Sequence, residues 1–147
     1  MRQIIDTLAQ LQRLRDKSVK DMTVQLAKQQ QVCAGYENNI KALGYLIQKT
    51  GTGVAAPDIE SLKNVTGYKG TLRKVIAWQE QEQTLAKIKE ARIQKNLVAA
   101  ACEEKRVAMT LSDKRHQLRD DMAVQEQNAV DEIATQCWLR NRVLSQR

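Results

Sequence analysis

Residues 19–47, VKDMTVQLAKQQQVCAGYENNIKALGYLI, decide the fold of this chain. Apolar side chains recur in this stretch at alternating steps of three and four residues, and Gln29 is the polar exception. This spacing is the heptad pattern of a helix that packs along another helix. The positions of this first stripe are Val19, Met22, Leu26, Gln29, Cys33, Tyr36, Ile40, Leu43 and Ile47.

A second, more diluted stripe follows the same stepping between residues 62 and 118 and is apolar at 11 of its 17 positions. The two stripes predict two helices that pack on each other along their length. The positions of the second stripe are Leu62, Val65, Lys69, Leu72, Ile76, Gln79, Gln83, Ala86, Glu90, Ile93, Leu97, Ala100, Glu104, Val107, Leu111, Lys114 and Leu118.

The residues that break helices are confined to the middle of the chain. All six glycines and Pro57 lie between residues 35 and 70, and the densest cluster predicts a turn at residues 50–57. We therefore expect an all-α fold, a long antiparallel two-helix coiled-coil hairpin. It would form a single coiled-coil domain over residues 1–147, with helices at about 2–49 and about 58–144. Gly67 and Gly70 within the second helix indicate a bend or a close helix approach.

The two helices differ in length. At 1.5 Å per residue the first helix would run roughly 70 Å and the second roughly 130 Å. The C-terminal ~40 residues would then have no intramolecular partner. Met122, Ala129, Ile133 and Leu144 keep an apolar side on this segment. It is either an amphipathic helix that needs another protein or a frayed tail.

The composition limits the class of protein. The chain has 147 residues, no Phe, 28% charged residues and a net charge of +7, so narrow apolar stripes are expected instead of a thick core. Three widely spaced cysteines without a CxxC pair indicate a reducing compartment. The N-terminus has no secretory signal pattern, and no apolar run approaches the ~18 residues of a membrane span. We expect a cytoplasmic protein.

The sequence predicts neither catalysis nor a bound cofactor or metal. His116 is the only histidine, and no serine or cysteine is placed to be activated by it. Adjacent acids such as Asp120 and Asp121 point ~100° apart on a helix and cannot act as facing carboxylates. The Gly51-Thr52-Gly53 segment lacks the Gly-Lys-Ser/Thr ending of a phosphate loop. The chain is therefore expected not to be an enzyme.

Two basic clusters have two interpretations. Arg13, Arg15, Lys17 and Lys20 form one, and Arg140, Arg142 and Arg147 end the chain. A basic coiled-coil protein that binds nucleic acid, or a helical scaffold, is the alternative function, although no aromatic residues interleave with these basic residues. Acidic protein loops fit the clusters equally well. A salt titration distinguishes the two, because neutralising several phosphates makes DNA affinity fall steeply with salt.

Residues 125–135, QEQNAVDEIAT, resemble the C-terminal signature of the flagellar export protein family FliJ. In that family a Met-Asp-Glu-Phe-Ala-like string ends the second helix, and here Val130 and Ile133 replace Met and Phe. The two-helix plan, the glycine-rich turn and the pattern Tyr68, Leu72, Val75 are also similar. The resemblance extends over nearly the whole chain.

The resemblance implies a cytoplasmic, non-enzymatic stalk or escort component of the flagellar type III export apparatus, peripherally associated with the inner membrane. Implied partners are the hexameric export ATPase FliI, the cytoplasmic domain of the export gate FlhA, and export chaperones. No nucleic acid partner is implied.

The resemblance also implies where these partners bind. The residues expected to face the gate, here called the gate patch, are Asn39, Leu43, Leu46, Tyr68, Leu72, Val75 and Gln79. Leu43 and Leu72 lie on the stripes, where the pattern alone favours core residues, whereas Leu46, Tyr68 and Val75 lie beside the stripes and are the stronger candidates for an exposed apolar site. The end of the hairpin with the N-terminus and the C-terminal helix would enter the ATPase ring. The arginines expected there, here called the ATPase arginines, are Arg13, Arg15, Arg140 and Arg142.

Overall fold

The computed structural model describes residues 1–50 and 59–146, and these residues form two helices. Helix α1 spans Arg2–Lys49 and helix α2 spans Ile59–Ser145. Lys49 in the last turn of α1, and Glu60 and Arg142 in the first and last turns of α2, oppose the partial charges of the helix ends. The expected all-α class and helix positions are confirmed, whereas most of the expected turn at 50–57 lies outside the described residues.

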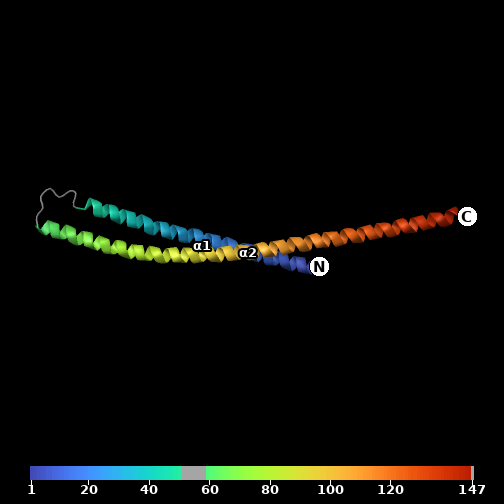
Figure 1. Ribbon diagram of the computed structural model, residues 1–147, viewed down its shortest axis with the longest axis horizontal. Helices are drawn as coiled ribbons and strands as arrows, with labels where there is room; N and C mark the ends of the chain where they lie inside the picture. Colours follow the sequence, from blue (N-terminus) through green and yellow to red (C-terminus); the bar gives the residue numbers. More distant parts are fainter. Residues whose placement is uncertain (51–58, 147) are drawn as a thin grey trace. The chain divides into compact units, whose positions relative to one another are not determined.

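The contacts divide the chain into two compact units, residues 18–100 and residues 1–17 with 101–147. The expected single domain therefore stays a prediction. In the first unit α1 and α2 lie side by side and antiparallel (Figure 1). Nε2 of the buried Gln29 donates a hydrogen bond to the carbonyl of Ala86 at 3.0 Å. This bond satisfies a polar group inside the apolar seam and fixes the register of the two helices.

Both predicted stripes form the helix interface. Every position of the first stripe is buried or half-buried, as is every position of the second stripe except Leu62. The expectation that Leu62 is a core residue is wrong, because its side chain is 52% exposed. In the register of Gln25 opposite Ile93, the last residue of α1 is level with Lys69. Leu62 therefore lies beyond the end of α1.

In the second unit the N-terminal part of α1 packs on residues 101–118 of α2. Ile5 is buried and Leu111 is only 2% exposed, so the apolar seam extends to a part of α1 that the first stripe did not include. The three-residue spacing of Ile5 and Leu8 in the sequence already indicated that the apolar side of α1 extends this far. Beyond Leu118 every described residue of α2 is exposed, so the predicted overhang is confirmed but is shorter than expected. The excess length of α2 is shared between residues 59–68 and the C-terminal segment.

Gly67 and Gly70 are ordinary helical positions of α2. A Cβ atom added at either glycine would meet no heavy atom of the described residues within 4 Å. The close helix approach that these glycines indicated is therefore not present. The two glycines only lower the stability of α2, because a glycine loses more backbone freedom than other residues when a helix forms.

Candidate functional site

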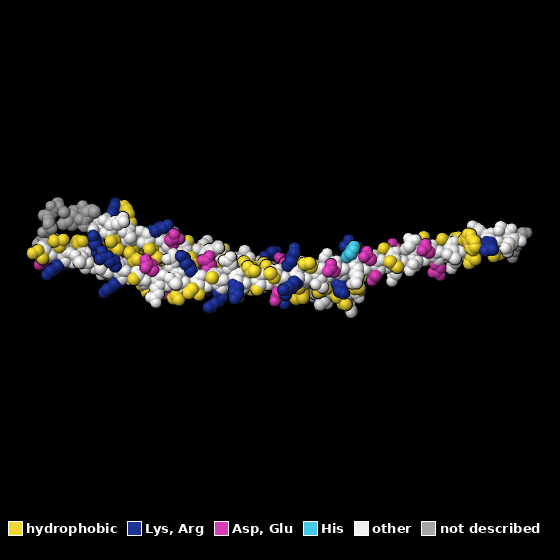
Figure 2. Space-filling view, viewed as in Figure 1, with side chains coloured by type: hydrophobic (Ala, Val, Ile, Leu, Met, Phe, Trp, Pro, Cys, Tyr) yellow, Lys and Arg dark blue, Asp and Glu magenta, His cyan; other side chains and the backbone are white. Residues whose placement is uncertain are grey.

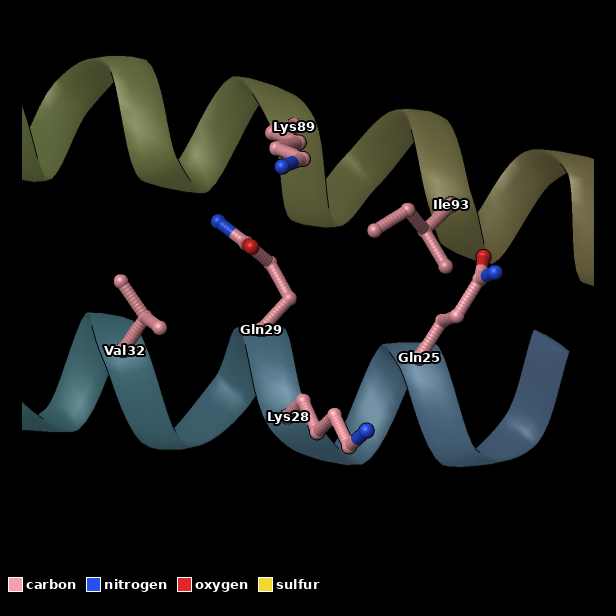
Figure 3. Close-up of a pocket in the computed structure, with 6 residues that line it drawn as sticks. All are labelled: Gln25, Lys28, Gln29, Val32, Lys89 and Ile93. Carbon is pink, nitrogen blue, oxygen red and sulfur yellow. The ribbon is translucent and has the colours of Figure 1, made fainter. Parts of the chain in front are cut away.

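The register of the first unit brings the gate patch together. Figure 3 shows Gln25 of α1 opposite Ile93 of α2 and Gln29 next to Lys89. Each step along α1 corresponds to an equal step back along α2, because the helices are antiparallel. The register therefore places Asn39 level with Gln79, Leu43 with Val75, and Leu46 with Leu72. Tyr68 is level with Thr50, at the end of α1.

The patch contains both exposed and buried apolar side chains. Leu46, Tyr68 and Val75 are 44%, 50% and 36% exposed, whereas Leu72 is 7% exposed and Leu43 is half-buried. This division matches the expectation that stripe residues are core and their neighbours are surface. Leu46, Tyr68 and Val75 are apolar groups that the packing of the hairpin does not require.

The two polar members of the patch differ in environment. Asn39 is exposed. Gln79 is half-buried, and its Oε1 atom is buried without a hydrogen-bond partner among the described residues. A buried carbonyl oxygen without a partner costs free energy, so Gln79 is a position where the packing of the two helices is not optimal.

The end of α1 is fixed next to this patch. The backbone N–H of Thr50 donates to the carbonyl of Leu46 at 2.9 Å, and the Thr50 hydroxyl donates to the same carbonyl at 2.6 Å. The ammonium group of Lys49 lies 4.9 Å from the centre of the Tyr45 ring. These contacts order the last turn of α1 beside Leu46.

The ATPase arginines all lie in the second unit, but they have different surroundings. Nη1 of Arg15 forms an ion pair of 2.8 Å with Oε2 of Glu103 on α2. Arg13 and Arg140 are exposed, and the guanidinium of Arg142 lies 5.2 Å from the centre of the Trp138 ring. The charge of Arg15 is therefore paired within the chain.

The four arginines do not form a single cluster. Arg15 is level with Glu103, and Arg140 follows 37 residues later on the same helix. At 1.5 Å per residue this separation is roughly 55 Å along α2. The structure therefore separates the arginines of α1 from those of the C-terminal segment. The ion pair of Arg15 was missed by sequence reasoning because it depends on the register.

Apart from the buried Cys33, the other titratable side chains of the described residues lie at least partly at the surface of the helices, as the pair of His116 and Asp120 illustrates. Nε2 of His116 lies 3.5 Å from Oδ2 of Asp120, and both side chains are exposed to solvent. The groove in Figure 3 lies open on the surface between the two helices and is lined by side chains of both. Within residues 1–50 and 59–146, no group of His, Cys, Asp or Glu side chains is arranged to hold a metal ion. No helix of this part of the chain is apolar enough over a sufficient length to cross a membrane.

Comparison with known proteins identifies one family. Residues 4–143 match the family described as Flagellar FliJ protein. No curated protein and no solved structure matches the chain. The family match includes nearly all of α1 and α2. The chain therefore belongs to the FliJ family and is a component of flagellar protein export.

Proposed function

We propose that this chain is a non-enzymatic stalk or escort component of the flagellar type III export apparatus. It binds and stimulates the hexameric export ATPase and couples it to the export gate and to export chaperones. The observation that carries the proposal is the family match over residues 4–143, on a helical pair with exposed apolar and basic surfaces.

The gate patch is the proposed contact with the cytoplasmic domain of the export gate. Leu46, Tyr68 and Val75 supply apolar surface that is exposed in the free protein. Burial of such groups is the main source of affinity between proteins. Leu43 and Leu72 hold the two helices together beneath them, together with the half-buried Gln79, and the exposed Asn39 supplies a polar group at the rim.

The ATPase arginines are the proposed contact with the export ATPase. Arg13 and Arg140 are exposed, and Arg142 is held by the Trp138 ring. Guanidinium groups pair well with carboxylates and backbone carbonyls, and their charge speeds association with acidic loops. Arg15 contributes to the proposed ATPase contact as part of its ion pair with Glu103.

The proposed location is the cytoplasm, with peripheral association at the inner-membrane export apparatus. Cys33, Cys102 and Cys137 are free thiols. Free cysteines are typical of a reducing compartment, and this supports the proposed location.

The experiment is a pull-down of the tagged, full-length chain from the cytoplasm of its own organism, with the captured proteins identified by mass spectrometry. The export ATPase and the export gate are expected with the wild-type chain. A Leu46→Ala/Tyr68→Ala variant should lose the gate and keep the ATPase. A variant with the four ATPase arginines changed to Glu should show the opposite pattern. Recovery of neither protein, or equal loss of both in each variant, would contradict the proposal.

A further inference from the structure

The C-terminal segment of α2, residues 119–146, has an exposed face that the hairpin leaves uncovered. The ion pair of Arg15 with Glu103 places Met1 level with Gln117. The N-terminal end of α1 therefore lies next to the start of this segment. All described residues of the segment are exposed.

The apolar side of this segment follows an eleven-residue spacing. Met122, Ile133 and Leu144 are eleven residues apart, which is three turns of about 3.67 residues. Their side chains therefore lie nearly in line along the helix. The positions on this line, here called the C-terminal face, are Met122, Glu126, Ala129, Ile133, Cys137, Arg140 and Leu144.

The spacing of residues along the C-terminal face is symmetric about Ile133. Its steps are four, three, four, four, three and four residues. Apolar residues end it, small side chains flank Ile133, and the acid Glu126 on one side matches the base Arg140 on the other. A surface of this kind is complementary to itself when a second helix is turned by 180°.

We propose that the C-terminal face binds a second copy of this chain, with the two α2 helices antiparallel and a two-fold axis at Ile133. Ile133 then packs on Ile133 of the second copy, and Met122 packs on the second copy's Leu144. Glu126 lies opposite Arg140 of the second copy, and this ion pair forms twice.

The charge of the segment fits this arrangement. Residues 119–132 carry the five acids Asp120, Asp121, Glu126, Asp131 and Glu132 and a single base, Arg119. Residues 133–147 carry three arginines and no acid. In Figure 2 acidic side chains lie along the first part of the segment, and a basic side chain lies near its C-terminal end. An antiparallel pair brings each acidic half onto a basic half, whereas a parallel pair would place like charges together.

The length of the exposed segment also fits. Ile133 lies near the middle of residues 119–146, and α2 ends at Ser145, so the helix of the second copy would end level with residue 121. The first residues of α1 are level with about Gln117, so the described part of the second helix does not overlap α1.

Side-chain contacts within the segment lie on the other side of the helix. Nε2 of Gln127 donates to Oδ1 of Asp131 at 3.0 Å, and Arg142 lies on the Trp138 ring. Glu126 and Arg140 have no ion-pair partner among the described residues. The charged groups of the C-terminal face are thus free to pair with the second copy.

The first test is sedimentation of the purified, full-length chain over a roughly hundredfold range of concentration, which needs no other protein. Wild type is expected to change from monomer to dimer. Glu126→Arg and Arg140→Glu, each alone, should raise the dissociation constant about tenfold or more, because like charges then face each other. An equimolar mixture of the two variants should dimerise again, since each supplies the charge that the other lacks. Circular dichroism checks that each variant is helical.

The second test locates the two-fold axis by disulfide formation. In a chain with Cys102→Ser and Cys137→Ser, the substitution Ile133→Cys should give a covalent dimer on mild oxidation. Thr135→Cys, at the same level but on the other side of the helix, is the matched control and should stay monomeric. A wild-type chain that is monomeric at every concentration, single reversals that dimerise like wild type, or equal cross-linking at both positions would each overturn the proposal.

Discussion

Tyr68 and Leu72 lie one turn apart on α2, yet only Leu72 is covered by α1. Leu72 lies on the stripe and within the length of α1, whereas Tyr68 lies beside the stripe and level with the end of α1. The stripe alone was wrong for Leu62, which has the right spacing but lies beyond the end of α1. A repeating stripe shows which side of a helix is apolar, but not how far the partner helix extends.

The first prediction separates core from surface in the gate patch. Tyr68→Ala and Leu46→Ala should each lower the free energy of unfolding by less than about 1 kcal/mol, as at surface sites. Leu72→Ala should lower it by about 2 to 5 kcal/mol, because it leaves a cavity between the helices. Thermal unfolding beside a pull-down with the gate domain measures both properties. If Tyr68→Ala destabilised the protein as much as Leu72→Ala, Tyr68 would be a core residue and the patch would be misplaced.

The second prediction concerns Cys33. Burial raises the pKa of its thiol above the ordinary value of 9.0, and its hydrogen bond to Glu90 raises the pKa further. The unfolded chain therefore loses this proton first, so the stability contributed by the buried thiol is full below pH 9 and falls as the pH rises toward the folded pKa. Urea unfolding across this range should show the fall in wild type and a smaller fall in Cys33→Ala. Identical slopes in the two proteins would contradict the assignment.

At the scale of the elements, both helices were predictable because their apolar period persists over many turns and the breakers are confined to the middle. The register of α1 on α2 was not predictable. A heptad stripe can slide along its partner by seven residues and still match apolar with apolar. Particular polar contacts select one alignment, namely Gln29 with Ala86 and Arg15 with Glu103.

The third prediction tests the glycines of α2. Gly67→Ala and Gly70→Ala should each raise the free energy of unfolding by about 1 kcal/mol, because alanine favours the helix and its Cβ meets open space. Urea denaturation of the single and double variants measures the gain. A loss of stability in either single variant would mean that another chain segment approaches that glycine closely.

At the scale of the whole molecule, the two proposed contacts fall in different units. The gate patch is in residues 18–100, and the ATPase arginines are in the unit formed by residues 1–17 and 101–147. The sequence predicted both surfaces only through the family resemblance, because neither surface contains a motif whose residues by themselves indicate a partner. It could not show that Arg15 is paired with Glu103 or that Arg140 is roughly 55 Å from that pair along α2.

The fourth prediction links the proposed self-association to the proposed ATPase contact, and it rests on both. Arg140 belongs to each surface, so a chain cannot use it for both partners at once. The disulfide dimer of the Ile133→Cys chain should therefore stimulate the ATPase less than the same chain after reduction. Equal stimulation before and after reduction would show that the C-terminal face and the ATPase contact do not overlap.

The most direct test of the proposed function is the rate of ATP hydrolysis by the export ATPase of the same organism, measured with and without this chain. Wild type should raise the rate. The variant with Arg13, Arg15, Arg140 and Arg142 changed to Glu should lose most of the increase while its helicity is unchanged, and added salt should weaken wild-type stimulation. Glu103→Gln, which removes the partner of Arg15 but keeps all four arginines, is the matched control and should still stimulate. No stimulation by wild type, or full stimulation by the fourfold variant, would contradict the account.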